Sequence, residues 1–184
     1  MLKRAKPIRH LRTFELMALA LSPKVEAHVK VAGEEIILGR LASTTPGERL
    51  TLAKRASQRI AAALLLDRDP RVMQAALANP RMTMASVAGA ISDPCAGQAL
   101  VHAVCRDPRW YAQTEVQAAL LRSPHTPFER AMYFIAELPV TVLRDLAEFL
   151  SLELQAEVAK ELERREDSNV IDIRLKPGTS TFKS

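Results

Sequence analysis

The sequence predicts an all-α protein whose short helices stack on one another. Hydrophobic residues make up 48% of the 184 and are mostly Ala and Leu, which favour helices, whereas aromatic residues account for only 4%. Seven of the eleven prolines directly follow Ser, Thr or Asp, the residues that cap helix N-termini, and six of these pairs are placed to start helices. The strings RDPR and QAAL each occur twice, which is typical of a chain built from related helical units.

The six Ser-Pro, Thr-Pro and Asp-Pro pairs are predicted to start helices. In such a pair the side-chain oxygen accepts a hydrogen bond from a free N–H of the first turn, and Pro at the first helical position has no N–H to leave unpaired. The pairs are Ser22-Pro23, Thr45-Pro46, Asp69-Pro70, Asp93-Pro94, Asp107-Pro108 and Thr126-Pro127. Glu48 and Glu129 are placed to complete capping boxes with the two threonines. Both copies of RDPR are therefore interpreted as helix starts.

The caps, prolines and apolar spacing together predict eleven helices with connections of one to four residues. Their expected ranges are 8–21, 23–31, 34–42, 46–66, 70–78, 83–92, 94–106, 108–122, 126–137, 139–150 and 152–165. Asn79-Pro80 and Ser123-Pro124 are expected to end the helices before them. Within 46–66 the apolar positions form one stripe, which we expect to be buried. In 152–165 a single apolar face indicates a polar end cap.

The two ends of the chain are predicted to lie outside the helical domain. Residues 1–12 carry five basic residues and no acidic one, and are expected to form a basic N-terminal arm. The helical-repeat domain is expected over 13–165. Residues 166–184 are predicted to form a flexible C-terminal tail in which the apolar stretch NVIDIRL, at 169–175, is strand-like and precedes a Pro-Gly pair.

Internal repetition indicates how the helices are arranged. QAAL occurs at 74–77 and 117–120, and each copy is followed by a turn with a proline and then by a predicted threonine cap, Thr83 or Thr126. The QAAL copies and the threonines are both offset by 43 residues. Units of roughly 40 residues built from short helices are typical of HEAT and armadillo solenoids. The stretches RDPRVMQAALANPRMT and VQAALLRSPHTP resemble the leucine-rich repeat variant, a HEAT-like bacterial family whose units share an Ala-Leu-x-x-Asn-Pro-x-x-Thr turn. This resemblance implies an α-solenoid over about residues 16–150.

No cofactor, metal site or enzymatic activity is expected. The leucine-rich repeat variant prototype holds an iron–sulfur centre with N-terminal cysteines, whereas this chain has no cysteine before Cys95. Cys95, His102 and Cys105 share a face of predicted helix 94–106. Cys95 would lie about 10 Å along the axis from His102, however, too far for one tetrahedral metal site. The glycines form no phosphate-binding pattern.

Positive charge is the main candidate for binding. Of the net charge of +5, residues 1–12 and residues 40–81 each carry an excess of five positive charges, and acidic segments offset the remainder. The candidate contacts to a partner or to nucleic acid are Arg49, Lys54, Arg55, Arg59, Arg68, Arg71, Arg81 and Arg109. Solvated helix faces are the alternative interpretation of these cations. Trp110 and Tyr111 would either stack on a base or pack between helices.

The predicted function is a non-catalytic protein-interaction module or scaffold in which successive helices line a groove for another protein. The alternative is a nucleic-acid-binding helical-repeat protein that uses the basic arm and residues 40–81. A third reading is a subunit that packs against copies of itself as a homo-oligomer. No apolar run approaches the roughly 18 residues that span a bilayer. We therefore expect no membrane contact and a cytoplasmic location.

Overall fold

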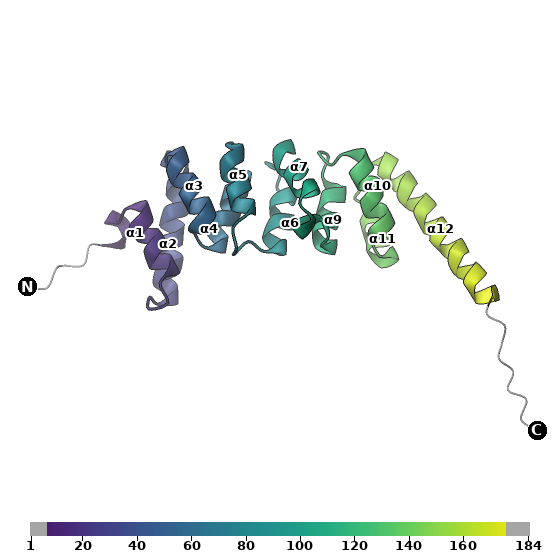
Figure 1. Cartoon of the computed structure of the whole chain (residues 1–184), viewed down its shortest axis with the longest axis horizontal. Coiled ribbons are helices and arrows are strands. Elements are labelled where there is room, and N and C mark those ends of the chain that lie inside the picture. The colour runs from purple at the N-terminus through teal and green to yellow at the C-terminus, as the bar shows by residue number, and fades with distance from the viewer. Residues whose placement is uncertain (1–6, 176–184) are drawn as a thin grey trace, which may run out of the picture.

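Short helices follow one another in chain order along one long axis (Figure 1). The computed structural model describes residues 7–175, with side chains described over 7–167. Over this range the chain forms twelve α-helices and no strand, which confirms the all-α class. The end with α1 and the end with α12 lie at opposite extremes of the axis. None of the described helices has both the length and the hydropathy of a membrane span.

All helices are short except the last. Their bounds are α1 Thr13–Leu21, α2 Ala27–Arg40, α3 Pro46–Arg55, α4 Gln58–Ala63, α5 Pro70–Leu77, α6 Met84–Ser92, α7 Gln98–Arg106, α8 Pro108–Tyr111, α9 Thr114–Arg122, α10 Phe128–Glu137, α11 Val140–Ala147 and α12 Leu152–Leu175. Three 3₁₀ turns, Ile8–His10, Leu41–Ser43 and Leu64–Leu66, connect some of them. In Figure 1, α3, α5, α7 and α10 form one row and α4, α6, α9 and α11 form the other.

The core runs as one continuous cluster between the two rows. It begins at Leu16 in α1 and continues to Val158 in α12. Leu65, Leu120 and Phe134 are among its largest side chains with no more than 2% of their surface exposed. Neighbours within a row also touch, most extensively α3 with α5 and α6 with α9. Each helix therefore buries its apolar face against helices on both sides.

Four predicted caps are confirmed. Thr45 and Glu48 form a capping box at the start of α3, and Thr83 accepts the Ser86 N–H at the start of α6. In both copies of RDPR the aspartate accepts the N–H two residues later. Arg71 N donates to Asp69 at 2.9 Å, and Arg109 N donates to Asp107 at 3.0 Å. RDPR is therefore a helix start in both places, as the sequence predicts.

The other three pairs do not start helices as predicted. Ser22 ends α1, and α2 begins only at Ala27. Asp93 ends α6 and accepts the Cys95 N–H at 2.7 Å in a turn before α7. Thr126 donates its hydroxyl to the Leu120 carbonyl at 2.6 Å, so α10 begins without the expected capping box. The same side chains also close turns, and whether a helix follows depends on the residues beyond.

Several predicted helix boundaries are wrong in the middle of the chain. The expected helix 46–66 breaks where Ala56 adopts an extended conformation, with ψ of 176°, and the expected helix 108–122 breaks between α8 and α9. Conversely, the expected helices 23–31 and 34–42 are the single helix α2. Gly33 lies buried within it, and a Cβ there would be 3.5 Å from the Leu19 side chain. This is an ordinary van der Waals distance, so the packing of α1 on α2 does not require a glycine, and Gly33 does not end the helix.

The predicted strand-like tail is helical as far as the structure describes it. The backbone of α12 continues through Leu175, so residues 166–175 extend the last helix. No Gly or Pro interrupts this stretch, and adding residues to an existing helix costs far less than nucleating a new one. Residues 1–6 of the predicted arm and 176–184 of the predicted tail lie outside the described residues.

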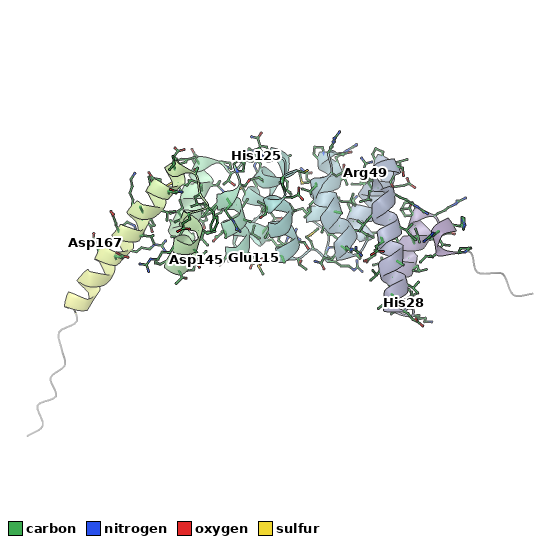
Figure 2. The ribbon with its side chains drawn as sticks, turned by 180° about the vertical axis from the view of Figure 1, so that it is seen from behind. His28, Arg49, Glu115, His125, Asp145 and Asp167 are labelled. Atoms are coloured by element: carbon green, nitrogen blue, oxygen red, sulfur yellow. The ribbon has the colours of Figure 1, made fainter. Side chains whose placement is uncertain are left out.

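Replacing Asp107 tests the cap that the Asp-Pro pair forms at the start of α8. Asp107→Ala should lower the free energy of unfolding by about 1 kcal/mol, because the first turn of α8 loses the carboxylate that accepts the Arg109 N–H. Urea denaturation followed by circular dichroism measures the change. Asp145→Ala is the control, since Asp145 is exposed on α11 (Figure 2) and has no polar partner among the described residues. Equal losses in both variants would contradict the capping role.

Candidate binding surface

In the structure the candidate cations form two groups near the two ends of α3, and Arg109 lies apart from both. Arg49, Arg68 and Arg71 lie near the start of α3 and the turn before α5, Lys54, Arg55, Arg59 and Arg81 lie around the end of α3, and Arg109 lies on α8. A helix of ten residues is about 15 Å long, so the first two groups lie at opposite ends of α3. The eight residues do not form one continuous surface.

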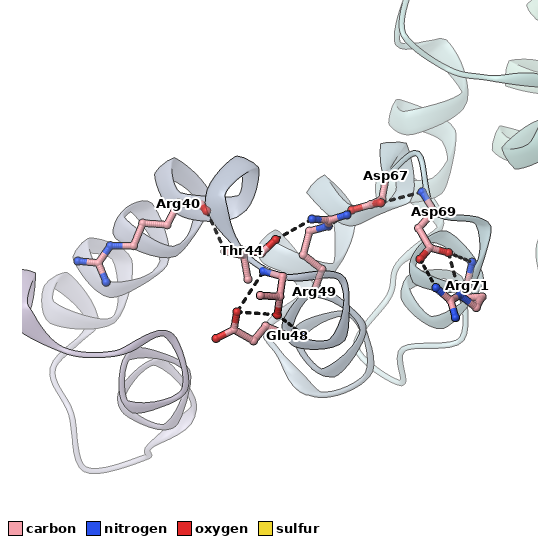
Figure 3. Close-up of polar contacts among 8 residues, drawn as sticks. Arg40, Thr44, Glu48, Arg49, Asp67, Asp69 and Arg71 are labelled. Carbon is pink, nitrogen blue, oxygen red and sulfur yellow. Dashed lines mark hydrogen bonds and ion pairs between the residues drawn. The ribbon is translucent and has the colours of Figure 1, made fainter.

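In the group at the start of α3, Arg49 and Arg71 are occupied by acidic neighbours (Figure 3). Arg49 Nε donates to Asp67 at 2.7 Å, and its Nη1 donates to the Thr44 carbonyl, also at 2.7 Å. The same Asp67 carboxylate accepts the Asp69 N–H at 2.9 Å. Hydrogen bonds from Arg71 in turn hold the pKa of Asp69 below its ordinary value. This chain of contacts joins α3 to the start of α5, so Arg49 and Arg71 have a structural role.

The group at the end of α3 is more exposed. Arg81 Nη1 donates to the Arg55 carbonyl at 3.3 Å, and Arg59 lies 3.7 Å from Glu35 on α2. Within the part of the chain that the structure describes, the charged groups of Lys54 and Arg55 have no hydrogen-bond or ion-pair partner. This is where the positive charge of residues 40–81 stays available.

Arg109 is a structural residue. Its Nη2 donates to the Leu77 carbonyl at 2.6 Å, and its guanidinium lies 4.4 Å from the centre of the Trp110 ring. Trp110 is only 6% exposed, so it packs between helices, which is one of the two roles that the sequence predicts for it. Arg109 thus covers the end of α5 while it also starts α8.

A buried asparagine explains the break after α3. Asn79 is 1% exposed, and its Nδ2 donates to the carbonyls of Ala53 at 2.7 Å and Ala56 at 3.3 Å. Its Oδ1 accepts the Arg81 N–H at 2.8 Å. The last carbonyls of a helix have no partner within the helix, so a side chain from the next unit satisfies them here. The Asn-Pro turn therefore fastens α5 to α3 as well as ending α5.

Arginines repeat this arrangement along the chain. Arg40 donates to the carbonyls of Arg9 at 2.6 Å and Leu11 at 2.8 Å, just before α1. Arg130 on α10 donates to the Cys105 carbonyl near the end of α7. Arg165 on α12 donates to three carbonyls at the end of α10, those of residues 135, 136 and 138, at 2.5 to 3.0 Å. With Arg109, these contacts place a cation at the negative ends of α5, α7 and α10.

Asn79→Ala tests this fastening. It should lower the free energy of unfolding by about 1–3 kcal/mol, because the carbonyls of Ala53 and Ala56 would be left buried without a donor. Thermal and urea unfolding report the loss. Gln113→Ala is the control, because Gln113 is an exposed amide that makes no capping hydrogen bond. An unchanged midpoint for Asn79→Ala would show that water satisfies these carbonyls equally well.

Glu161 positions Arg165 for its contacts and gives the last helix a pH dependence. Hydrogen bonds from Arg164 and Arg165 lower the pKa of Glu161 to about 2 from the ordinary 4.5. Because the folded pKa is the lower one, this stabilisation is present above about pH 4.5 and is lost as the pH falls toward 2.

Glu161→Gln should therefore destabilise the chain at neutral pH, and the difference from wild type should shrink below the ordinary carboxyl pKa. Urea midpoints measured at neutral pH and at several acidic pH values give the comparison. Glu163→Gln serves as the control, since Glu163 is an exposed neighbour with no polar partner among the residues described. A wild-type-to-variant difference that stays constant from neutral to acidic pH would contradict a depressed pKa.

Two hollows adjoin on the surface around α7. One, of about 540 Å³, lies between α5, α7 and the start of α8, and the other, of about 480 Å³, lies between α7, α8 and the start of α10. Both are bordered by His102 and Arg106, which are one turn apart on α7. We call the two hollows and this shared edge the α7 surface. It combines an apolar lining with a cationic edge.

Arg106 is the available cation of the α7 surface. It is exposed, and its guanidinium has no hydrogen-bond, ion-pair or aromatic partner among the described residues. By contrast, Arg130 lies 4.5 Å above the centre of the Tyr111 ring and bonds to the Cys105 carbonyl, which holds it against the wall of the second hollow. Asp107, the acidic residue in the lining, is used by the α8 cap and by Arg109 at 3.5 Å.

The α7 surface does not have the features of a catalytic or metal site. Burial raises the pKa of the Cys105 thiol, which keeps it a neutral, poor nucleophile. Cys95 lies in the turn before α7, so the predicted start of helix 94–106 is wrong and the helix carries Cys105 alone. Across the described residues, no three His, Cys, Asp or Glu side chains come together as metal ligands.

The sequence singles out His102 as a possible metal ligand, but nothing in it marks Arg106 or Arg130 as residues of a binding surface. The spacing of His102 and Arg106 does place them on one helix face. The hollows beside them depend on α5 and α10, however, whose positions no local pattern reveals. Comparison with known families, curated proteins and solved structures finds no match for the chain.

Proposed function

We propose that the chain is a non-catalytic protein-interaction module whose helices form an α-solenoid of the HEAT or leucine-rich repeat variant type. Support for the arrangement comes from the two rows of helices in chain order (Figure 1) and from the recurring contacts by which a later unit binds the ends of α3, α5, α7 and α10. Such rows present extended surfaces to which a partner binds along several helices at once.

The α7 surface is the observation that carries the proposed function. It is hollowed on both sides of one helix, lined by apolar and polar side chains, and edged by Arg106, whose guanidinium can fix the orientation of a partner. Its residues come from four helices, so a partner would contact several stacked helices at once and not a single helix. A protein segment fits a surface of this mixed character.

The second candidate function is nucleic-acid binding, and the cations around the end of α3 favour it. Lys54 and Arg55 are exposed without polar partners in the described chain, and Arg59 and Arg81 lie nearby. Phosphate contacts require such cations, and their effect falls steeply with salt. The weakness of this candidate is that Arg49, Arg71 and Arg109 are held in contacts within the chain.

Ala99→Tyr tests the protein-interaction function. Ala99 is exposed and lines the hollow between α5 and α7, so a tyrosine there fills the space that a partner would enter. Wild-type and variant chains are used to capture partners from extract of the source cell, with quantitative mass spectrometry of the bound proteins. We expect wild-type chain to retain proteins that Ala99→Tyr loses.

Ala18→Tyr is the matched control for this experiment, because Ala18 is an exposed helical alanine on α1, at the far end of the row. It should retain the same proteins as wild type. Nuclease treatment of the extract separates the two candidates, since proteins captured through bound nucleic acid are released. Equal capture by wild type and Ala99→Tyr would overturn the assignment of the interaction to the α7 surface.

A further inference from the structure

We propose that the α7 surface binds an acidic peptide segment of a partner protein, with a carboxylate on Arg106 and apolar side chains in the two hollows. The inference rests on the proposed protein-interaction function and adds the chemistry of the partner. It starts from Arg106, whose guanidinium is free at the edge that both hollows share. A guanidinium binds a carboxylate through two parallel hydrogen bonds.

The charge of the surface selects an acidic ligand. The titratable groups in its lining are Arg106, Arg109, Arg130, His102, Cys105 and Asp107. Asp107 is paired with Arg109, which leaves Arg106 and Arg130 as the net charge. The contacts of Arg130 with the Cys105 carbonyl and the Tyr111 ring do not neutralise it, so two positive charges flank the second hollow. A basic or neutral peptide would leave these charges without a counterion.

The shape and lining of the hollows add a requirement for apolar side chains. Leu77 and Ala103 line the hollow between α5 and α7, and Tyr111 and Pro127 line the hollow beside α10. A segment that crosses α7 at Arg106 therefore meets apolar surface on both sides of the charged contact. An acidic residue with apolar residues two positions before and after it matches this order, because every second side chain of an extended peptide points to the same face.

A peptide fits the α7 surface better than single-stranded nucleic acid does. Proteins that bind single strands stack the bases on exposed aromatic rings. Here Trp110 is 6% exposed, and the Tyr111 ring is covered by the guanidinium of Arg130 at 4.5 Å. Tyr111 is the aromatic residue in the lining, and Arg130 already stacks on its ring, whereas a carboxylate needs only Arg106 and its neighbours.

Selection from a random dodecapeptide display library on the full chain tests the proposal. Peptides that bind wild type are synthesised with a fluorescent label, and their affinities are measured by anisotropy. We expect enrichment of Asp and Glu two positions from apolar residues, and affinities that fall with salt. Arg106→Gln should weaken binding about tenfold, since a charge-assisted contact is lost, and Ala99→Tyr should weaken it as well.

Arg68→Gln is the matched control, because Arg68 is also an exposed arginine without a polar partner among the described residues but lies outside the α7 surface. Its affinity for the peptides should equal that of wild type, and circular dichroism should show that all three variants are folded. An equal loss in Arg68→Gln would show a general charge effect and would overturn the proposal.

The remaining outcomes separate this proposal from the function on which it rests. Peptides that are lost with Ala99→Tyr but are neither acidic nor sensitive to Arg106→Gln would overturn the acidic ligand and keep the interaction surface. Binding peptides that are all insensitive to Ala99→Tyr would overturn both. A labelled oligothymidylate that binds wild type more tightly than the peptides do, and loses affinity with Arg106→Gln, would overturn the peptide in favour of nucleic acid.

Discussion

The fold depends on the pairing of helix-end carbonyls with side chains from later units. A row of short helices has many ends, and the last carbonyls at each end lack partners within their own helix. Asn79 satisfies them after α3, and Arg109, Arg130 and Arg165 do so at α5, α7 and α10. Long helices would need few such contacts. In this chain each contact also fixes the position of one helix relative to another, so capping and stacking are achieved by the same side chains.

This requirement changes how the basic composition is interpreted. An excess of arginine first indicates a surface for acidic partners. Most of the arginines that could form such a surface instead donate to carbonyls or to Asp67, Asp69 and Asp107. What distinguishes Arg106 is that it ends α7 without taking part in any such contact among the described residues. Unlike the neighbouring Arg109 and Arg130, which contact other parts of the chain, Arg106 is available to bind a ligand, and it lies where the two hollows meet.

The last helix follows the same logic on a larger scale. Arg165 reaches three carbonyls of α10 while Glu161 and the apolar face of α12 hold it in position. The apolar residues beyond it had suggested a strand, yet the backbone continues as a helix to Leu175. A strand needs a neighbouring strand to satisfy its backbone groups, and the described residues provide none. A helix satisfies those groups within itself.

The all-α class and the caps at Thr45, Asp69, Thr83 and Asp107 follow from the sequence alone, because a cap joins atoms only two or three residues apart. The break at Ala56, the destinations of the arginines and the α7 surface were decided by tertiary structure. The contacts of Asn79, Arg81, Arg109 and Arg130, for example, join residues separated by 23 to 32 positions. Local spacing cannot reveal which of several arginines reaches a distant carbonyl, because that depends on how the intervening helices pack.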